Sequence, residues 1–153
     1  MPDDGFQFEN ADDSPGFSLW QVSSMWQRRI NEGLRPFDLT HAQFVLLASL
    51  AWLASDDNLL TQAALASHAK MDTMMVSNVL RTLEEKGLIA RTSHPTDTRA
   101  KSLTVTSKGR ALASQVVPVV ENIDREFFSQ LEGNAGEFNR YLQMLILKNQ
   151  SEH

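Results

Sequence analysis

A short helix, a tight joint and a longer helix, all between residues 61 and 87, constrain the fold of this chain more than any other feature. Thr61 is the expected N-cap of the short helix, over residues 62–68. After the joint, Asp72 is expected to cap the longer helix, and Gly87 to stop it. Two helices joined so closely predict a helix-turn-helix unit.

Two strand-like segments follow the longer helix. Residues 88–93 and 101–105 are short, and they are β-branched or alternating, as the strands of a hairpin are. The longer helix has the dimensions to enter a major groove, and a hairpin beside it can reach the adjacent backbone or minor groove. The order therefore predicts a winged helix-turn-helix, in a fold that is mostly α with a small β-hairpin wing (α+β).

The residues before this unit predict a mobile arm and one amphipathic helix. Residues 1–16 lack periodicity, and the arm is assigned to them. From Phe17 onward, apolar residues recur every three or four positions until Gly33 and Pro36 end the helix. The repeating positions are Leu19, Val22, Trp26, Ile30 and Leu34.

A second helix is predicted from Thr40 to about residue 54. Thr40 and Gln43 have the spacing of a capping box. The helix is apolar almost all round, which is typical of burial on several sides. A turn is expected at residues 55–58.

Two further helices are predicted after the hairpin. Thr106 restarts the helical pattern, and an amphipathic stretch covers residues 107–131, with Pro118 as the expected site of a kink. A last helix covers residues 135–149.

Composition limits the classes of protein that this chain fits. The 153 residues are enough for one domain and include no cysteine, which excludes disulfides and thiolate metal sites within the chain. No apolar run approaches the length of a membrane span, and the acidic start lacks the basic and apolar regions of a secretory signal. A cytoplasmic location is the default expectation.

The net charge of −5 is unevenly distributed. Residues 1–60 carry 3 Lys/Arg against 9 Asp/Glu, residues 61–110 carry 8 against 4, and residues 111–153 carry 3 against 6. The net charge is thus −6, +4 and −3 in turn. Positive charge gathers on the predicted helix-turn-helix and wing, as expected of a nucleic-acid footprint, although chance clustering of solvated charges gives the same pattern.

The longer helix has a face suited to reading bases. If Val76, Leu80 and Leu83 point inward, the opposite face presents short polar groups, one methionine and one arginine. Asn pairs with adenine, Arg with guanine, Ser or Thr with a base or phosphate, and Met can contact thymine methyls. Each alone also fits an ordinary surface side chain. The predicted DNA contacts on this helix are Thr73, Met74, Ser77, Asn78 and Arg81.

The hairpin supplies further positive charge. Arg91 and Lys101 lie on its predicted strands, with His94 and Arg99 in or beside its loop. Asp97 is suited to hold the loop through local hydrogen bonds or an ion pair, which would let Arg99 enter a narrow minor groove.

The segment "LASHAKMDTMMVSNVLRTLEEKGLIARTSHPTDTRAKSLTVTSKG", residues 65–109, resembles the MarR family of bacterial transcriptional regulators. Val105 stands where family members commonly carry Leu, a conservative departure. The matching positions are Leu65, Ala66, Leu83, Lys86, Gly87, Leu88, Ile89, Arg91, Asp97, Arg99, Thr106 and Gly109.

The resemblance implies a homodimer, built from the first helix and the last two, that reads a pseudo-palindromic operator in double-stranded DNA. It also implies that Arg99 is the minor-groove residue at the wing tip and that Asp97 organises the wing. The chain then divides into an arm (1–16), a dimerisation helix (17–36), a winged helix-turn-helix lobe (37–109) and C-terminal dimerisation helices (110–150). The expected function is that of a transcriptional regulator, specifically a repressor.

MarR-like proteins often respond to small aromatic or anionic effectors bound between the dimer helices and the DNA-binding lobe. The effector-binding candidates by position are Trp20, Trp26, Arg28, His41 and Phe44. Aromatic residues at helical spacing are also typical of a plain core. Four scattered histidines give no metal-ligand spacing, so neither a metal nor another cofactor is expected.

Two other classes of protein are possible from the sequence. A winged-helix protein-interaction module without DNA binding fits the acidic total charge. An enzyme is disfavoured, because the chain shows no nucleophile–base constellation, no Gly-rich phosphate loop and no carboxylate cluster in an apolar setting.

Overall fold

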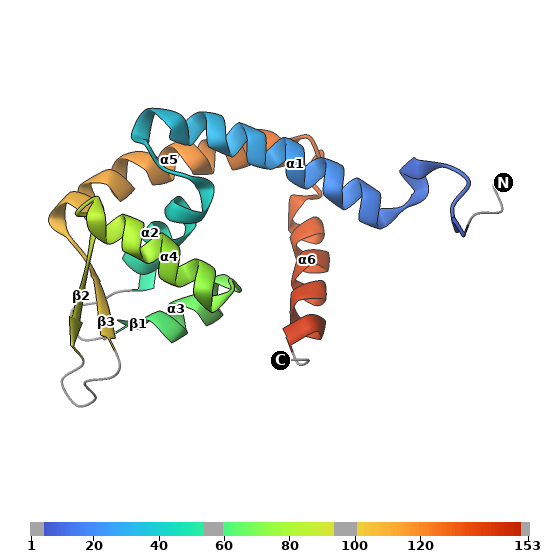
Figure 1. Cartoon of the computed structure of the whole chain (residues 1–153). Helices are drawn as coiled ribbons and strands as arrows, with labels where there is room; N and C mark the ends of the chain where they lie inside the picture. Colours follow the sequence, from blue (N-terminus) through green and yellow to red (C-terminus); the bar gives the residue numbers. More distant parts are fainter. Residues whose placement is uncertain (1–4, 54–59, 94–100, 151–153) are drawn as a thin grey trace.

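The computed structural model describes residues 5–53, 60–93 and 101–150 (Figure 1). Two long helices, α1 and α5, lie side by side. The lobe formed by α2, α3, α4 and the sheet packs against one end of this pair. The helices are η1 (Ala11–Asp13), α1 (Pro15–Leu34), η2 (Arg35–Phe37), α2 (His41–Leu53), α3 (Gln62–Ala69), α4 (Thr73–Glu85), α5 (Ser107–Ser129) and α6 (Ala135–Gln150), and the strands are β1 (Leu60–Thr61), β2 (Ile89–Ser93) and β3 (Lys101–Val105).

One hydrophobic core joins the lobe to the long helices. The nearly all-apolar α2 lies at its centre, in contact with α1, α3, α4, α5 and β3. This position explains why α2 lacks a polar face: it is surrounded on several sides. The fully buried side chains of the core include Ile30, Leu34, Leu46, Leu47, Leu50, Leu65, Val76, Leu80, Leu83, Leu103 and Val116.

Local capping fixes the starts of the helices of the lobe. The capping box is confirmed: the backbone N–H of Gln43 donates to Thr40 Oγ1 at 3.1 Å, and that of Thr40 donates to Gln43 Oε1 at 3.2 Å. Thr61 caps α3 through the N–H of Ala64, and Asp72 caps α4 through the N–H of Met74. These caps confirm the predicted helix-turn-helix.

The first helix begins earlier than predicted. Ser14 accepts a hydrogen bond from the N–H of Phe17, and Pro15 occupies the first helical position, so α1 starts at Pro15 rather than at Phe17. Ser followed by Pro is a regular helix start, and the periodicity missed it because the first turn faces solvent.

The wing contains one strand more than predicted. The sheet has the order β1-β3-β2 with both pairs antiparallel, Leu60 opposite Leu103 and Arg91 opposite Leu103 on the other side. The turn expected at residues 55–58 lies outside the described residues.

The C-terminal helices match the expected order. α5 continues through Pro118 as one helix, and α6 leaves the α1–α5 pair at a steep angle (Figure 1). Within the described ranges, no helix combines the length and hydropathy that a membrane span requires.

Candidate DNA-binding surface

The second helix of the helix-turn-helix, α4, presents a polar face to solvent. Val76, Leu80 and Leu83 are fully buried, as the sequence predicts. On the other side Thr73, Met74, Asn78 and Arg81 are exposed, and Ser77 is half-buried. The side chain of Met74 is 71% exposed at the start of the helix. All five predicted contact residues therefore come from one helix, and four of them are freely accessible.

The C-terminal end of α4 is tied to the turn before α2. Lys86 Nζ donates to the carbonyl oxygen of Asp38 and, at 3.1 Å, to Gln43 Oε1, and it lies 3.6 Å from Asp38 Oδ2. The side chain of Gln43 is buried, and its Oε1 accepts hydrogen bonds both from the N–H of Thr40, in the cap of α2, and from Lys86 at the end of α4. These contacts hold the end of α4 against the start of α2.

Arg91 is placed differently from the other predicted contacts. Its side chain is only 16% exposed and points from β2 into the lobe. Nη1 donates to Gln62 Oε1 at 3.3 Å and Nη2 donates to the carbonyl oxygen of Ser77 at 3.4 Å. The guanidinium therefore contacts α3 and α4, and sequence spacing gave no sign of these partners.

His94, Asp97 and Arg99 lie outside the described residues, as does the side chain of Lys101, whose backbone belongs to β3.

The effector candidates separate into two groups. Trp20 is 72% exposed and Arg28 is also exposed on α1, so neither lines an enclosed site. Trp26 and His41 meet edge to face, with ring centroids 5.0 Å apart. Trp26 Nε1 donates to Asp124 Oδ1 at 2.8 Å, which links α1 to α5.

His41 lies half-buried at the start of α2, within reach of the charge on Asp124. Burial lowers the pKa of His41 below its ordinary value of 6.5, and the negative charge of Asp124 opposes part of this shift. The imidazole is therefore neutral at neutral pH.

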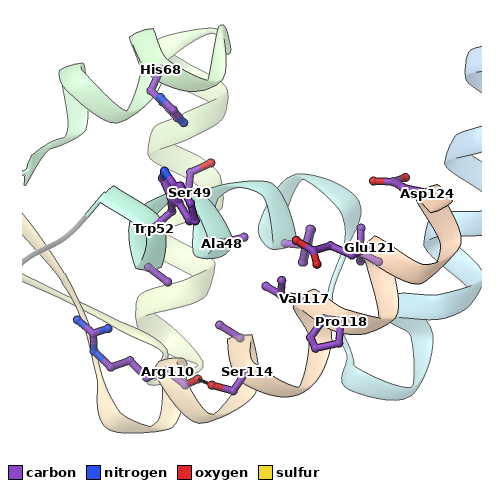
Figure 2. Close-up of a pocket in the computed structure, with 14 residues that line it drawn as sticks. Ala48, Ser49, Trp52, His68, Arg110, Ser114, Val117, Pro118, Glu121 and Asp124 are labelled. Atoms are coloured by element: carbon purple, nitrogen blue, oxygen red, sulfur yellow. Dashed lines mark hydrogen bonds between the residues drawn. The ribbon is translucent and has the colours of Figure 1, made fainter. Parts of the chain in front are cut away.

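A groove with a volume of about 770 Å³ runs between α2 and α5 and includes Phe44 (Figure 2). His68 overhangs one end from α3, and Glu121 and Asp124 lie at the other. Sequence periodicity missed most of these residues, because contacts between α2 and α5 depend on the tertiary fold. The lining residues are Phe44, Ala48, Ser49, Ala51, Trp52, His68, Arg110, Ala113, Ser114, Val117, Pro118, Val120, Glu121 and Asp124.

A winged helix-turn-helix with an exposed polar face on its second helix defines the class of this protein as a winged-helix DNA-binding protein. The profile of the MarR family matches residues 39–101, which span α2 to the start of β3.

Similar proteins agree with this class. The chain is 44% identical over 123 residues to the HTH-type transcriptional regulator YdcH of Bacillus subtilis (strain 168), covering 80% of this chain and 84% of the relative. It is 34% identical over 137 residues to the HTH-type transcriptional repressor Rv2887 of Mycobacterium tuberculosis (strain ATCC 25618 / H37Rv), covering 88% and 96%. The crystal structure of the S. aureus MepR–DNA complex superimposes with a TM-score of 0.76 at 27% identity, covering 92% and 98%.

The chain therefore belongs to the MarR family and is a transcriptional regulator rather than an enzyme. The resemblance of residues 65–109 to this family is confirmed, and so is the mostly helical winged fold.

Proposed function

We propose that the chain acts as a homodimeric, sequence-specific repressor that a small molecule releases from DNA. Each protomer inserts α4 into a major groove, where Thr73, Met74, Ser77, Asn78 and Arg81 contact bases and phosphates. The wing reaches the neighbouring minor groove through Arg99, with Asp97 shaping its loop and Lys101 adding positive charge.

The observation that carries this proposal is the exposed, nearly charge-free face at the start of α4. A merely solvated helix carries many charged residues, whereas this face carries short polar groups, an exposed methionine and one arginine. The crystal structure of MepR in complex with DNA, which has the same fold, supports DNA binding by this chain. The repressor name of the Mycobacterium tuberculosis relative supports the direction of regulation.

Alanine substitution in α4 and at the wing tip tests the proposal. Arg81→Ala and Arg99→Ala should each weaken binding to a DNA fragment that the wild type retains, by about tenfold, because each removes one charged contact. Arg125→Ala is the matched control, since Arg125 is an exposed arginine of α5 that donates a hydrogen bond to Asn122 of its own helix. Equal affinity of all four proteins would contradict the proposed surface.

Exposed apolar side chains on two helices support a homodimer. Single copies of soluble proteins rarely leave so many large apolar residues of neighbouring helices in water. A dimer formed through α1 and α6 covers them and gives two α4 helices, which read half-sites roughly 34 Å apart. The residues concerned are Phe17, Leu19, Trp20, Val22, Met25, Tyr141, Met144, Leu145, Ile146 and Leu147.

The groove between α2 and α5 is the proposed effector site. Phe44 lines this groove, Trp26 bonds Asp124 at its end and contacts His41, and Trp20 and Arg28 remain candidates outside it. Arg110 and the aromatic rings of Phe44 and Trp52 suit a small aromatic anion. Phenolic acids should release the protein from its DNA fragment, and Ala48→Trp, which fills the groove, should abolish the response. A panel without any releasing compound would argue against this site.

A further inference from the structure

We propose that Arg91 is a positioning residue, which sets the angle of the wing against α4 so that both can contact adjacent DNA grooves together. This inference rests on the proposed DNA-binding surface. It assigns Arg91 a role inside the lobe, in place of the direct DNA contact that its charge and position predict.

The side chain of Arg91 joins three elements at one point. It starts from the middle of β2, directly opposite Leu103 of the central strand β3. Its two terminal nitrogens donate to Gln62 at the start of α3 and to the backbone of Ser77 in the middle of α4. Its Nε lies 4.0 Å from Glu84 Oε1, near the end of α4.

The guanidinium suits this position because its donors point in fixed, divergent directions. A flexible ammonium group acts as a point charge and cannot address two helices in the same way. Arg91 Nε is buried and has no hydrogen-bond partner in the described parts of the chain, so Glu84 balances its charge without a hydrogen bond. A buried cation of this kind is costly to leave unpaired, which favours the bound arrangement over a free side chain.

The contact with Ser77 connects this cluster to the DNA-facing side of α4. Ser77 is half-buried, and the next residue, Asn78, is exposed on the proposed base-reading face. To reach a phosphate, Arg91 would have to leave Gln62, Ser77 and Glu84 at once. The hydrogen bonds instead fix the base of the wing relative to the part of α4 that enters the groove.

The experiment compares Arg91→Lys and Arg91→Met with the wild-type full chain. DNA affinity is measured over a series of salt concentrations, on a fragment that the wild type retains, well below the unfolding temperature of each variant. Both variants should lose about tenfold in affinity, and the slope of log affinity against log salt should stay unchanged, because no phosphate contact is lost. Gln62→Leu, which removes one partner and keeps Arg91, should lose about threefold.

A footprint separates positioning from general destabilisation. In the Arg91→Lys complex, hydroxyl-radical protection of the minor groove beside the wing should weaken, while dimethyl sulfate protection of guanines in the major groove persists. A protein that is only less stable would lose both protections together.

Three results would overturn the inference. The first is wild-type affinity of Arg91→Lys together with a slope lowered by about one in Arg91→Met, which would make Arg91 a phosphate contact. The second is unchanged affinity of both variants while Arg81→Ala weakens binding, and the third is equal loss of both protections. If the wild type binds no DNA fragment at all, the proposed function itself fails.

Discussion

Gly109 lies where the first turn of α5 crosses the chain just before β2. A Cβ atom at this position would overlap the carbonyl oxygen of Leu88 and come within 2.8 Å of Val105 Cγ1. The same carbonyl accepts a hydrogen bond from the N–H of Thr106, so it is not free to move away. The absence of a side chain at position 109 therefore allows the wing and the long helix to meet.

Gly109→Ala should lower the free energy of unfolding by about 2 to 3 kcal/mol, because the new methyl group must displace buried backbone. Gly136→Ala is the matched control, since no atom of the described residues lies within 4 Å of the Cβ position of Gly136 in α6. The control should be neutral or up to about 1 kcal/mol more stable. Urea unfolding of both variants measures the difference, and equal stabilities would contradict the close packing at Gly109.

His41 gives the stability of the fold a dependence on pH. Its pKa is lowered in the folded protein, mainly by burial, so the unfolded chain binds a proton more readily. The neutral form contributes its full stability above pH 6.5, and this contribution is lost as the pH falls below 6.5 through the folded pKa.

The wild type should therefore lose more stability between pH 7.5 and pH 5 than His41→Gln does. Urea unfolding at the two pH values measures this difference. His68→Gln is the control, because His68 is exposed on α3. If the wild type and His41→Gln lose the same stability between the two pH values, protonation of His41 does not contribute to the pH dependence of stability.

At the scale of elements, sequence reasoning was most successful where a signal is local. Thr40, Thr61 and Asp72 cap helices within three residues of themselves, so their sequence neighbours already contain the information. Strand β1 has only two residues, and its pairing with β3 depends on a part of the chain about 40 residues away, so no pattern marks it. The inward direction of Arg91 was missed for the same reason: its partners belong to α3 and α4.

A partly buried hydrogen bond is one of the links between α1 and α5. Trp26 Nε1 donates to the carboxylate of Asp124 at 2.8 Å, and bonds to charged groups are stronger than average. A double-mutant cycle with Trp26→Phe and Asp124→Ala should give a coupling energy of about 1.5 to 3 kcal/mol from urea unfolding. Additive effects of the two substitutions would mean that the bond contributes nothing to the stability of the pair of helices.

At the scale of the whole molecule, net positive charge and most of the large exposed apolar side chains belong to different parts of the chain. Residues 61–110 carry the net positive charge, whereas α1 and α6 carry most of the large exposed apolar side chains. This separation fits a protein that pairs with its own copy at one end and with DNA at the other.

A charge placed within the apolar face of α6 should dissociate the proposed dimer. Leu145 is 58% exposed, and Leu145→Glu should raise the dissociation constant of the dimer by about two orders of magnitude, because a carboxylate would be buried on association. Gln143→Glu adds the same charge at an exposed polar position of the same helix and should have little effect. Sedimentation equilibrium measures both, and an unchanged association state of Leu145→Glu would place the interface elsewhere.

Sequencing the DNA fragments that the full chain retains at physiological salt tests the central claim most directly. A dimeric reader of two major grooves should enrich a pseudo-palindrome whose half-sites are centred about one helical turn apart, and its affinity should fall steeply with log salt. Retained fragments without a common motif, or affinity that does not change with salt, would contradict the account and favour a winged-helix protein-interaction module.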